Sequence, residues 1–132
     1  MAQDYRHENT SVTLINYHFV WIVRRRRKVI DEDIEARLKV LVSEVCQKLD
    51  CEIIALEVDN KDHVHLFLNA PPIYSPAQLM HRIKGYSARY LREEFAELQK
   101  LPSMWTRSYF CGTAGNVSGA TIKRYVENQK SR

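Results

Sequence analysis

Hydrophobic and polar positions repeat with two different periods along the chain. Residues 11–23 (SVTLINYHFVWIV) are β-branched and aromatic on both faces, which is typical of an interior strand. Residues 51–58 and 62–70 are two further apolar runs, and the turn DNKD at 59–62 joins them into a predicted hairpin. Residues 104–113 predict a fourth strand.

Three segments carry the period of a helix. Asp31 is a suitable N-cap for a helix to about Leu49. Ser75, Pro76 and Gln78 form a capping-box pattern that starts a second helix, to about Leu98. A last helix is expected from about 118 to 130. The apolar residues expected to face inward are Ile34, Leu38, Leu41, Val42, Val45 and Leu49 in the first helix, and Leu79, Ile83, Leu91 and Phe95 in the second.

The order of these elements predicts the fold. Strand, helix, strand, strand, helix, strand is the split βαβ, or ferredoxin-like, arrangement of the α+β class. It has an antiparallel four-stranded sheet with two helices on one face. A chain of 132 residues is expected to form a single domain over 1–132, with the polar residues 1–10 as a flexible arm.

The strand at 62–70 carries the candidate chemistry. Val64, Leu66, Leu68 and Ala70 alternate onto one apolar face, while His63 and His65 share the other face. Two imidazoles placed in this way can bind one metal ion. They are equally compatible with ordinary polar positions on a half-exposed strand, so the rest of the chain has to decide. By the same alternation, Asp62 is expected to point away from His63.

Charge and composition narrow the class of protein. Lys and Arg outnumber Asp and Glu by 20 to 16, and five positive charges stand together at 24–28, which favours nucleic acid as a partner. The three cysteines have no C-x-x-C spacing, so reduced thiols are expected. No apolar signal region, membrane span or Walker-type loop is present in the sequence. We therefore expect a cytoplasmic protein without a membrane or nucleotide cofactor.

The last predicted helix supplies a second motif. Tyr125 and Gln129 are four residues apart and so share one helix face. Together, DHVHLF at 62–67, IKRYVENQ at 122–129, LPSMWTRSYF at 101–110 and RRRRKV at 24–29 resemble the single-tyrosine HUH transposases of small insertion sequences, the IS200-like family. HUH denotes two histidines around a bulky hydrophobic residue. The resemblance extends from about Leu14 to Gln129.

The resemblance assigns a role to four residues. It implies that His63 and His65 bind a metal ion, with Gln129 as third ligand, and that Tyr125 is the nucleophile. Such transposases cut and rejoin single-stranded DNA at the ends of their element, recognise DNA hairpins and act as homodimers. Related replication initiators often have a second tyrosine beside the nucleophile. None lies near Tyr125, so the single-tyrosine group fits better.

The implied chemistry is covalent catalysis on phosphorus. The Tyr125 phenol would attack a phosphodiester, the 3′ oxygen would leave, and the 5′ phosphate would stay on tyrosine. Mg²⁺ or Mn²⁺ suits a site of two imidazoles and an amide oxygen. The sequence offers no convincing general base. The residues expected to follow the DNA backbone are Arg24, Arg25, Arg26, Arg27, Lys28, Arg82, Lys84, Arg89 and Lys123.

Other readings of the same residues stay open. A zinc hydrolase could use His63 and His65 with His81 or His18. A noncatalytic sheet that binds single strands is another possibility. A domesticated relative would do the same chemistry on chromosomal palindromic repeats. The strand at 12–23 is apolar on both faces, which suits either a central strand or an edge strand paired with a second copy in a homodimer.

Overall fold

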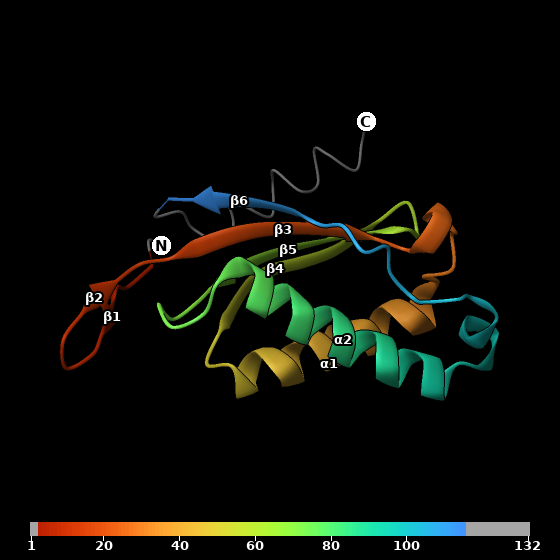
Figure 1. Cartoon of the computed structure of the whole chain (residues 1–132), viewed down its shortest axis with the longest axis horizontal. Helices are drawn as coiled ribbons and strands as arrows, with labels where there is room; N and C mark the ends of the chain where they lie inside the picture. Colours follow the sequence, from red (N-terminus) through yellow and green to blue (C-terminus); the bar gives the residue numbers. More distant parts are fainter. Residues whose placement is uncertain (1–2, 116–132) are drawn as a thin grey trace.

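A computed structural model describes residues 3–115 of the chain (Figure 1). Its main sheet has four strands in the order β4-β5-β3-β6, and all neighbours are antiparallel. Two helices cover one face of this sheet (Figure 1). The predicted ferredoxin-like α+β arrangement is confirmed. The bounds are β3 Asn16–Ile22, α1 Glu32–Lys48, β4 Glu52–Asp59, β5 His63–Asn69, α2 Pro76–Glu94 and β6 Phe110–Ala114.

The core lies between the sheet and the two helices. Val64, Leu66 and Leu68 of β5 are fully buried beneath α1 and α2, as the alternation of the strand predicts. The expected apolar stripe of α1 is buried as well. Both helices begin at their predicted caps: the Asp31 carboxylate accepts from the backbone N–H of Ile34 at 2.9 Å, and Ser75 forms a complete capping box.

The second helix ends earlier than its apolar pattern predicts. Glu94 is its last residue, and Phe95 has an extended backbone with φ −120°. A short 3-10 helix, η2 (Ala96–Lys100), follows and brings Leu98 into the core, where it is fully buried. Leu98 therefore continues the apolar pattern of α2 although it belongs to the separate helix η2. The pattern alone consequently predicts a helix that is too long.

The N-terminal part is a hairpin where a flexible arm was expected. β1 (Arg6–His7) pairs with β2 (Val12–Thr13), and the pair projects from one end of the molecule (Figure 1). The Arg6 guanidinium holds this hairpin to the sheet, because it donates to the Asn69 side chain at 2.9 Å and to the Asp50 carbonyl at 2.9 Å. The expected strand over 11–23 is thereby divided into β2 and β3.

β3 is a central strand. It lies between β5 and β6, so both of its edges are paired, and the interpretation of β3 as an edge strand is wrong. Phe19 and Trp21 are buried on the helix side, whereas Val20 and Ile22 on the other face are half-buried. Two buried asparagine side chains connect β3 with β5. The Asn69 amide donates to the Asn16 side chain at 3.0 Å, and these two residues are directly paired in the register. The Asn16 amide also donates to the Gly115 carbonyl at 2.9 Å.

The fourth strand is shorter than predicted. Before β6, only Trp105 bridges to the sheet, at Val23. Strand pairing is interrupted between Trp105 and the start of β6. The Lys84 ammonium accounts for this interruption, because it donates to the carbonyl oxygens of residues 106, 107 and 108 at 2.7, 3.4 and 3.1 Å. The segment bulges out of the pairing here: Trp105 pairs with Val23 and Phe110 with Val20, so it has two more residues than β3 between these pairs.

Two smaller expectations concern the described part of the chain. Its three cysteines are all free thiols, and burial raises the pKa of Cys46 to about 12. Within residues 3–115, neither helix has the length and apolar character needed to cross a membrane.

Candidate active site

His63 and His65 lie on the sheet face opposite to the helices, as the alternation of the strand predicts. Both are half-buried, whereas Val64 between them is fully buried on the helix side. The register places Asp59 of β4 opposite His63, and Glu57 opposite His65. The two imidazoles are therefore next to each other, with carboxylates on the adjoining strand.

Asp62 corrects an expectation from the sequence. It was expected to point away from His63, but its carboxylate oxygen Oδ1 lies 2.6 Å from Nδ1 of His63. Alternation does not apply here because β5 begins at His63, and Asp62 still belongs to the preceding turn. A carboxylate only accepts, so Nδ1–H of His63 is the donor, and in a neutral ring this leaves the lone pair on Nε2. Carboxylates orient metal-binding histidines in this way.

The Asp62 side chain is held firmly by its surroundings. It is 3% exposed, and its backbone carbonyl accepts from Val23 N–H at 2.9 Å. The turn before it has left-handed backbone at Asn60 and Lys61, with φ of 54° and 61°. This tight turn directs the Asp62 carboxylate back onto the imidazole. The sequence signal was the position of Asp62 at the end of the DNKD turn.

His18 is a third imidazole on the same face, one strand away. Its ring stacks on Phe67, with centroids 4.1 Å apart and planes at 6°, and lies 5.8 Å from His65 at 20°. Burial, and secondarily His65, lowers the pKa of His18 to about 4, so it is neutral at pH 7. Nearly parallel rings do not direct their in-plane lone pairs at a common point, so His18 is poorly placed as a ligand with His65.

His81 is not near the histidine pair. It belongs to α2, which covers the other face of the sheet. The zinc hydrolase interpretation is thus left without a third imidazole ligand in the described residues. In the same part of the chain, no three His, Cys, Asp or Glu side chains come together as a metal site.

The basic residues fall into two groups. One is the turn η1 (Arg24–Arg26) and the two residues after it, which follow β3 at the end where Ile22 pairs with His63. Arg25 and Arg26 are exposed and have positive φ, 58° and 54°. The Arg24 guanidinium donates to Ser103 Oγ at 3.2 Å, whereas Arg27 and Lys28 are exposed.

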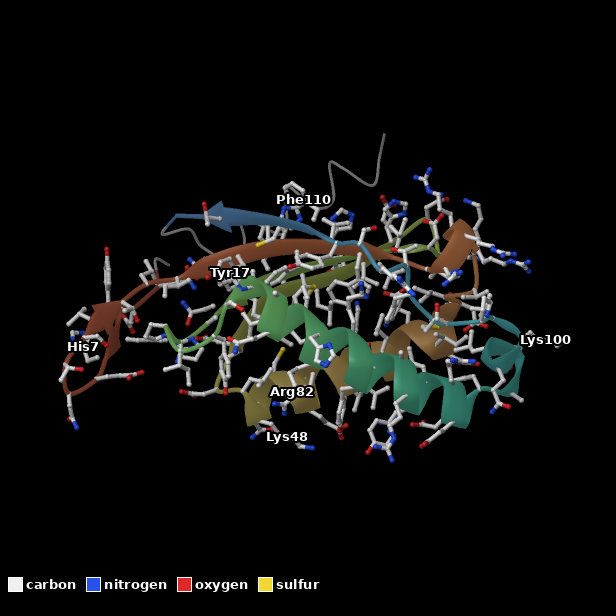
Figure 2. All side chains as sticks on the ribbon, in the orientation of Figure 1. His7, Tyr17, Lys48, Arg82, Lys100 and Phe110 are labelled. Carbon is white, nitrogen blue, oxygen red and sulfur yellow. The ribbon has the colours of Figure 1, made fainter. Side chains whose placement is uncertain are left out.

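The second group lies on α2. Arg82 and Arg89 are exposed on this helix, and Figure 2 shows Arg82 on the side of α2 away from the sheet. Phe110, in contrast, projects from β6 on the side away from the helices (Figure 2). Lys84 differs from both arginines because it is half-buried on backbone carbonyls, and burial lowers its pKa. The expected DNA-binding residues that the structure describes therefore lie in two separate places, at one end of β3 and on the exposed side of α2.

Three of the expected site residues lie outside the described part of the chain: Tyr125, Gln129 and Lys123. The structure thus brings together His63, His65 and, unexpectedly, Asp62. Two imidazoles on one exposed sheet face, one of them oriented by a buried carboxylate, fit a divalent cation that keeps further positions for oxygen ligands.

Comparison with solved structures defines the class of protein. A crystal structure of a candidate transposase from Deinococcus radiodurans superimposes with a TM-score of 0.78 at 30% identity, covering 94% of this chain and 97% of that one. A REP-associated tyrosine transposase bound to a REP hairpin has the same fold, with a TM-score of 0.60 at 15% identity over 92% of this chain and 68% of its own. The chain shares its fold with these transposases.

Sequence comparison identifies the family. The family model for IS200-like transposases matches residues 11–129. The ISDra2 transposase TnpA of Deinococcus radiodurans is 31% identical over 121 residues, which are 89% of this chain and 86% of that protein. The transposase for insertion sequence element IS200 of Salmonella typhimurium is 28% identical over 116 residues, 86% of this chain and 75% of its own. The chain belongs to the IS200-like transposase family.

Proposed function

We propose that this transposase cleaves and rejoins single-stranded DNA through a 5′-phosphotyrosine on Tyr125, at a site that holds Mg²⁺ or Mn²⁺ with His63, His65 and Gln129. The observation that carries the proposal is the histidine pair on the sheet face opposite to the helices, with His63 oriented by Asp62. A purely structural pair of histidines would not require a buried carboxylate on one ring.

The protein residues would divide the reaction between them. The Tyr125 phenol attacks phosphorus, its oxygen forms the new bond, and the 3′ oxygen leaves as the strand breaks. An unperturbed phenol has a pKa of about 10, so its conversion to phenolate needs assistance at neutral pH. A bound divalent ion would supply Lewis-acid stabilisation of the phosphate. His63 and His65 would hold that ion, and Asp62 would keep Nε2 of His63 available for it.

Exposed arginines would direct the DNA strand to this site. Arg25 and Arg26 follow β3 at the end that pairs with His63, so a strand lying across the histidine face would pass close to them. Such contacts neutralise phosphates and give affinity that falls with salt, without reading sequence. Hairpin recognition is supported by the related fold that was solved with a hairpin bound.

The proposed activity is tested with labelled oligonucleotides. With Mn²⁺ or Mg²⁺, we expect the protein to cut a single-stranded oligonucleotide that carries the ends of its own element and to leave the matching duplex intact. EDTA should stop cutting, and adding the ion back should restore it. A denaturing gel would resolve product and covalent adduct. Equal cutting of duplex and single strand would contradict the proposal.

A homodimer is proposed as the working unit. Mixing Tyr125→Phe subunits with His63→Ala subunits tests whether a tyrosine acts in the partner's metal site. We expect mixed dimers to regain cleavage, because one of their two sites would then have an intact tyrosine and an intact histidine pair. Light scattering of each variant is the control for assembly. A monomer at micromolar concentration, or inactive mixed dimers, would contradict shared sites.

Asp62→Ala is expected to weaken metal binding roughly 10- to 100-fold, the usual effect of losing a carboxylate behind a histidine ligand. The physical reason is that His63 would lose the partner that fixes its tautomer and ring orientation. Asp62→Asn keeps an acceptor for Nδ1–H and should lose less. Titration calorimetry with Mn²⁺ measures the affinity, and circular dichroism verifies the fold. Unchanged Mn²⁺ affinity in Asp62→Ala would remove Asp62 from the site.

A further inference from the structure

Two buried asparagines meet at the end of the sheet that is remote from the histidine pair. Asn16 of β3 and Asn69 of β5 are 2% and 3% exposed, and they pair directly in the register. By strand alternation they lie on the same sheet face as His65, which is four residues, or about 13 Å, away from Asn69 along β5. The proposed chemistry uses neither asparagine.

The Asn16 amide also binds the chain beyond β6. Its Nδ2 donates to the backbone carbonyl of Gly115 at 2.9 Å. Pairing between β3 and β6 ends at Asn16 and Ala114, so this bond holds the chain one residue past the last paired position (Figure 1). Gly115 is exposed, and water could satisfy its carbonyl equally well. What the buried donor supplies is therefore a fixed position for Gly115.

The N-terminal residues hold the Asn16 amide in place. Gln3 forms a two-way amide pair with it, because Gln3 Nε2 donates to Asn16 Oδ1 at 3.1 Å and Asn16 Nδ2 donates back to Gln3 Oε1. Asn69 Nδ2 donates to the same Oδ1 at 3.0 Å, and Arg6 Nε donates to Asn69 Oδ1 at 2.9 Å. Both N–H groups of Asn16 and both lone pairs of its oxygen are thus used, which fixes the direction of its bond to Gly115.

Gly115 is the point from which the chain continues toward Tyr125. Tyr125 follows it by ten residues, a length that covers about 15 Å as a helix and more when extended. The distance along the sheet from the asparagines to His65 is of the same size. The place at which Gly115 is fixed consequently limits the positions that the phenol can reach relative to a histidine pair.

We propose that Asn16 is a positioning residue for Tyr125: by holding the Gly115 carbonyl, it fixes the point at which the chain leaves the sheet toward the nucleophile. This inference rests on the proposed function and deepens it, because it adds to the metal site a second determinant of where the tyrosine acts. Gln3 serves the same purpose by fixing the Asn16 amide. Misplacement of a reacting group by about 1 Å lowers a rate up to about a hundredfold, so loss of such an anchor is measurable.

Asn16→Ala should lower the cleavage rate at saturating oligonucleotide roughly 10- to 100-fold, while KM and the Mn²⁺ affinity stay within about twofold of the parent. Asn69→Ala is the matched control. It removes an equally buried amide from the same cluster but no contact with Gly115, so it should keep the parental rate. Hydrogen exchange of residues 110–115 should become faster in Asn16→Ala and not in Asn69→Ala.

A lengthened chain separates positioning from a structural role. Two glycines inserted between Gly115 and Asn116 release the following chain from its anchor without changing the amides. In that background Asn16→Ala should cost little further activity, because the insertion has already removed what the amide provides. A purely structural role of Asn16 would lower the rate by the same factor with and without the insertion.

Three results would overturn the inference: a parental rate in folded Asn16→Ala, an equal loss in Asn69→Ala, or full additivity with the insertion. Circular dichroism verifies the fold. If Asn16→Ala does not fold, Gln3→Ala tests the same anchor from outside the sheet, and an unchanged rate would overturn the inference as well. A parent that forms no tyrosine adduct would reject the proposed chemistry together with this role. Cleavage through Tyr125 that does not depend on Asn16 would reject the positioning role alone.

Discussion

Tyr125→Phe is expected to reduce strand cleavage by at least about a thousandfold, the scale on which loss of a covalent nucleophile acts. Phenylalanine keeps the aromatic ring but has no oxygen to bond phosphorus. DNA binding should be unchanged, because no charge is lost. Cleavage rates on a single-stranded oligonucleotide measure the effect.

The attachment site gives a direct check on this assignment. Mass spectrometry of the trapped adduct should place the 5′ phosphate on the peptide that contains Tyr125. Tyr109→Phe is the matched control, since it removes an exposed phenol elsewhere and should cleave as the parent does. An adduct on Tyr109, or cleavage that persists in Tyr125→Phe, would refute the role of Tyr125.

His63→Ala and His65→Ala are each expected to abolish cleavage while leaving hairpin affinity within about twofold of the parent. The reason is that the imidazoles would act on phosphate chemistry through the ion, whereas affinity would come from arginines, which neither change alters. Cleavage and anisotropy assays on the same preparations separate the two effects.

Gln129→Ala should be milder than either histidine change, because a neutral amide is a weak ligand that water can replace.

His18→Ala serves as the control for the sheet face itself. Its ring stacks on Phe67 and is poorly placed as a ligand, so cleavage should survive. Loss of hairpin binding in His63→Ala with the fold intact would contradict the separation of chemistry from affinity.

The alternation of residues 62–70 was enough to predict which face carries the histidines, because burial of Val64, Leu66 and Leu68 leaves only one face for them. Helix caps were equally predictable, since Asp31 and Ser75 act through local hydrogen bonds. Local signals of this kind depend on residues close in sequence, and so a single sequence contains them.

Two elements that the sequence did not predict correctly, the start of β6 and the N-terminal hairpin, depend on contacts between residues that are distant in sequence. Lys84 determines where β6 starts by binding carbonyls more than twenty positions away. The hairpin at the N-terminus depends on Arg6 reaching Asn69. The contact of Asp62 with His63 was missed for another reason: strand alternation was applied one residue before the strand begins.

The buried Asn16–Asn69 pair bears on how faithfully the sheet assembles. If β5 slipped by one residue against β3, both imidazoles would turn toward the helices and Val64 would face outward. The same slip would break the contact between the two amides, and a buried amide donor that loses its acceptor costs roughly 1–3 kcal/mol. Apolar strands alone tolerate such a shift more easily, since one aliphatic contact replaces another. A pair of amides far from the histidines thus protects the chemistry by making the mispaired sheet unfavourable during folding.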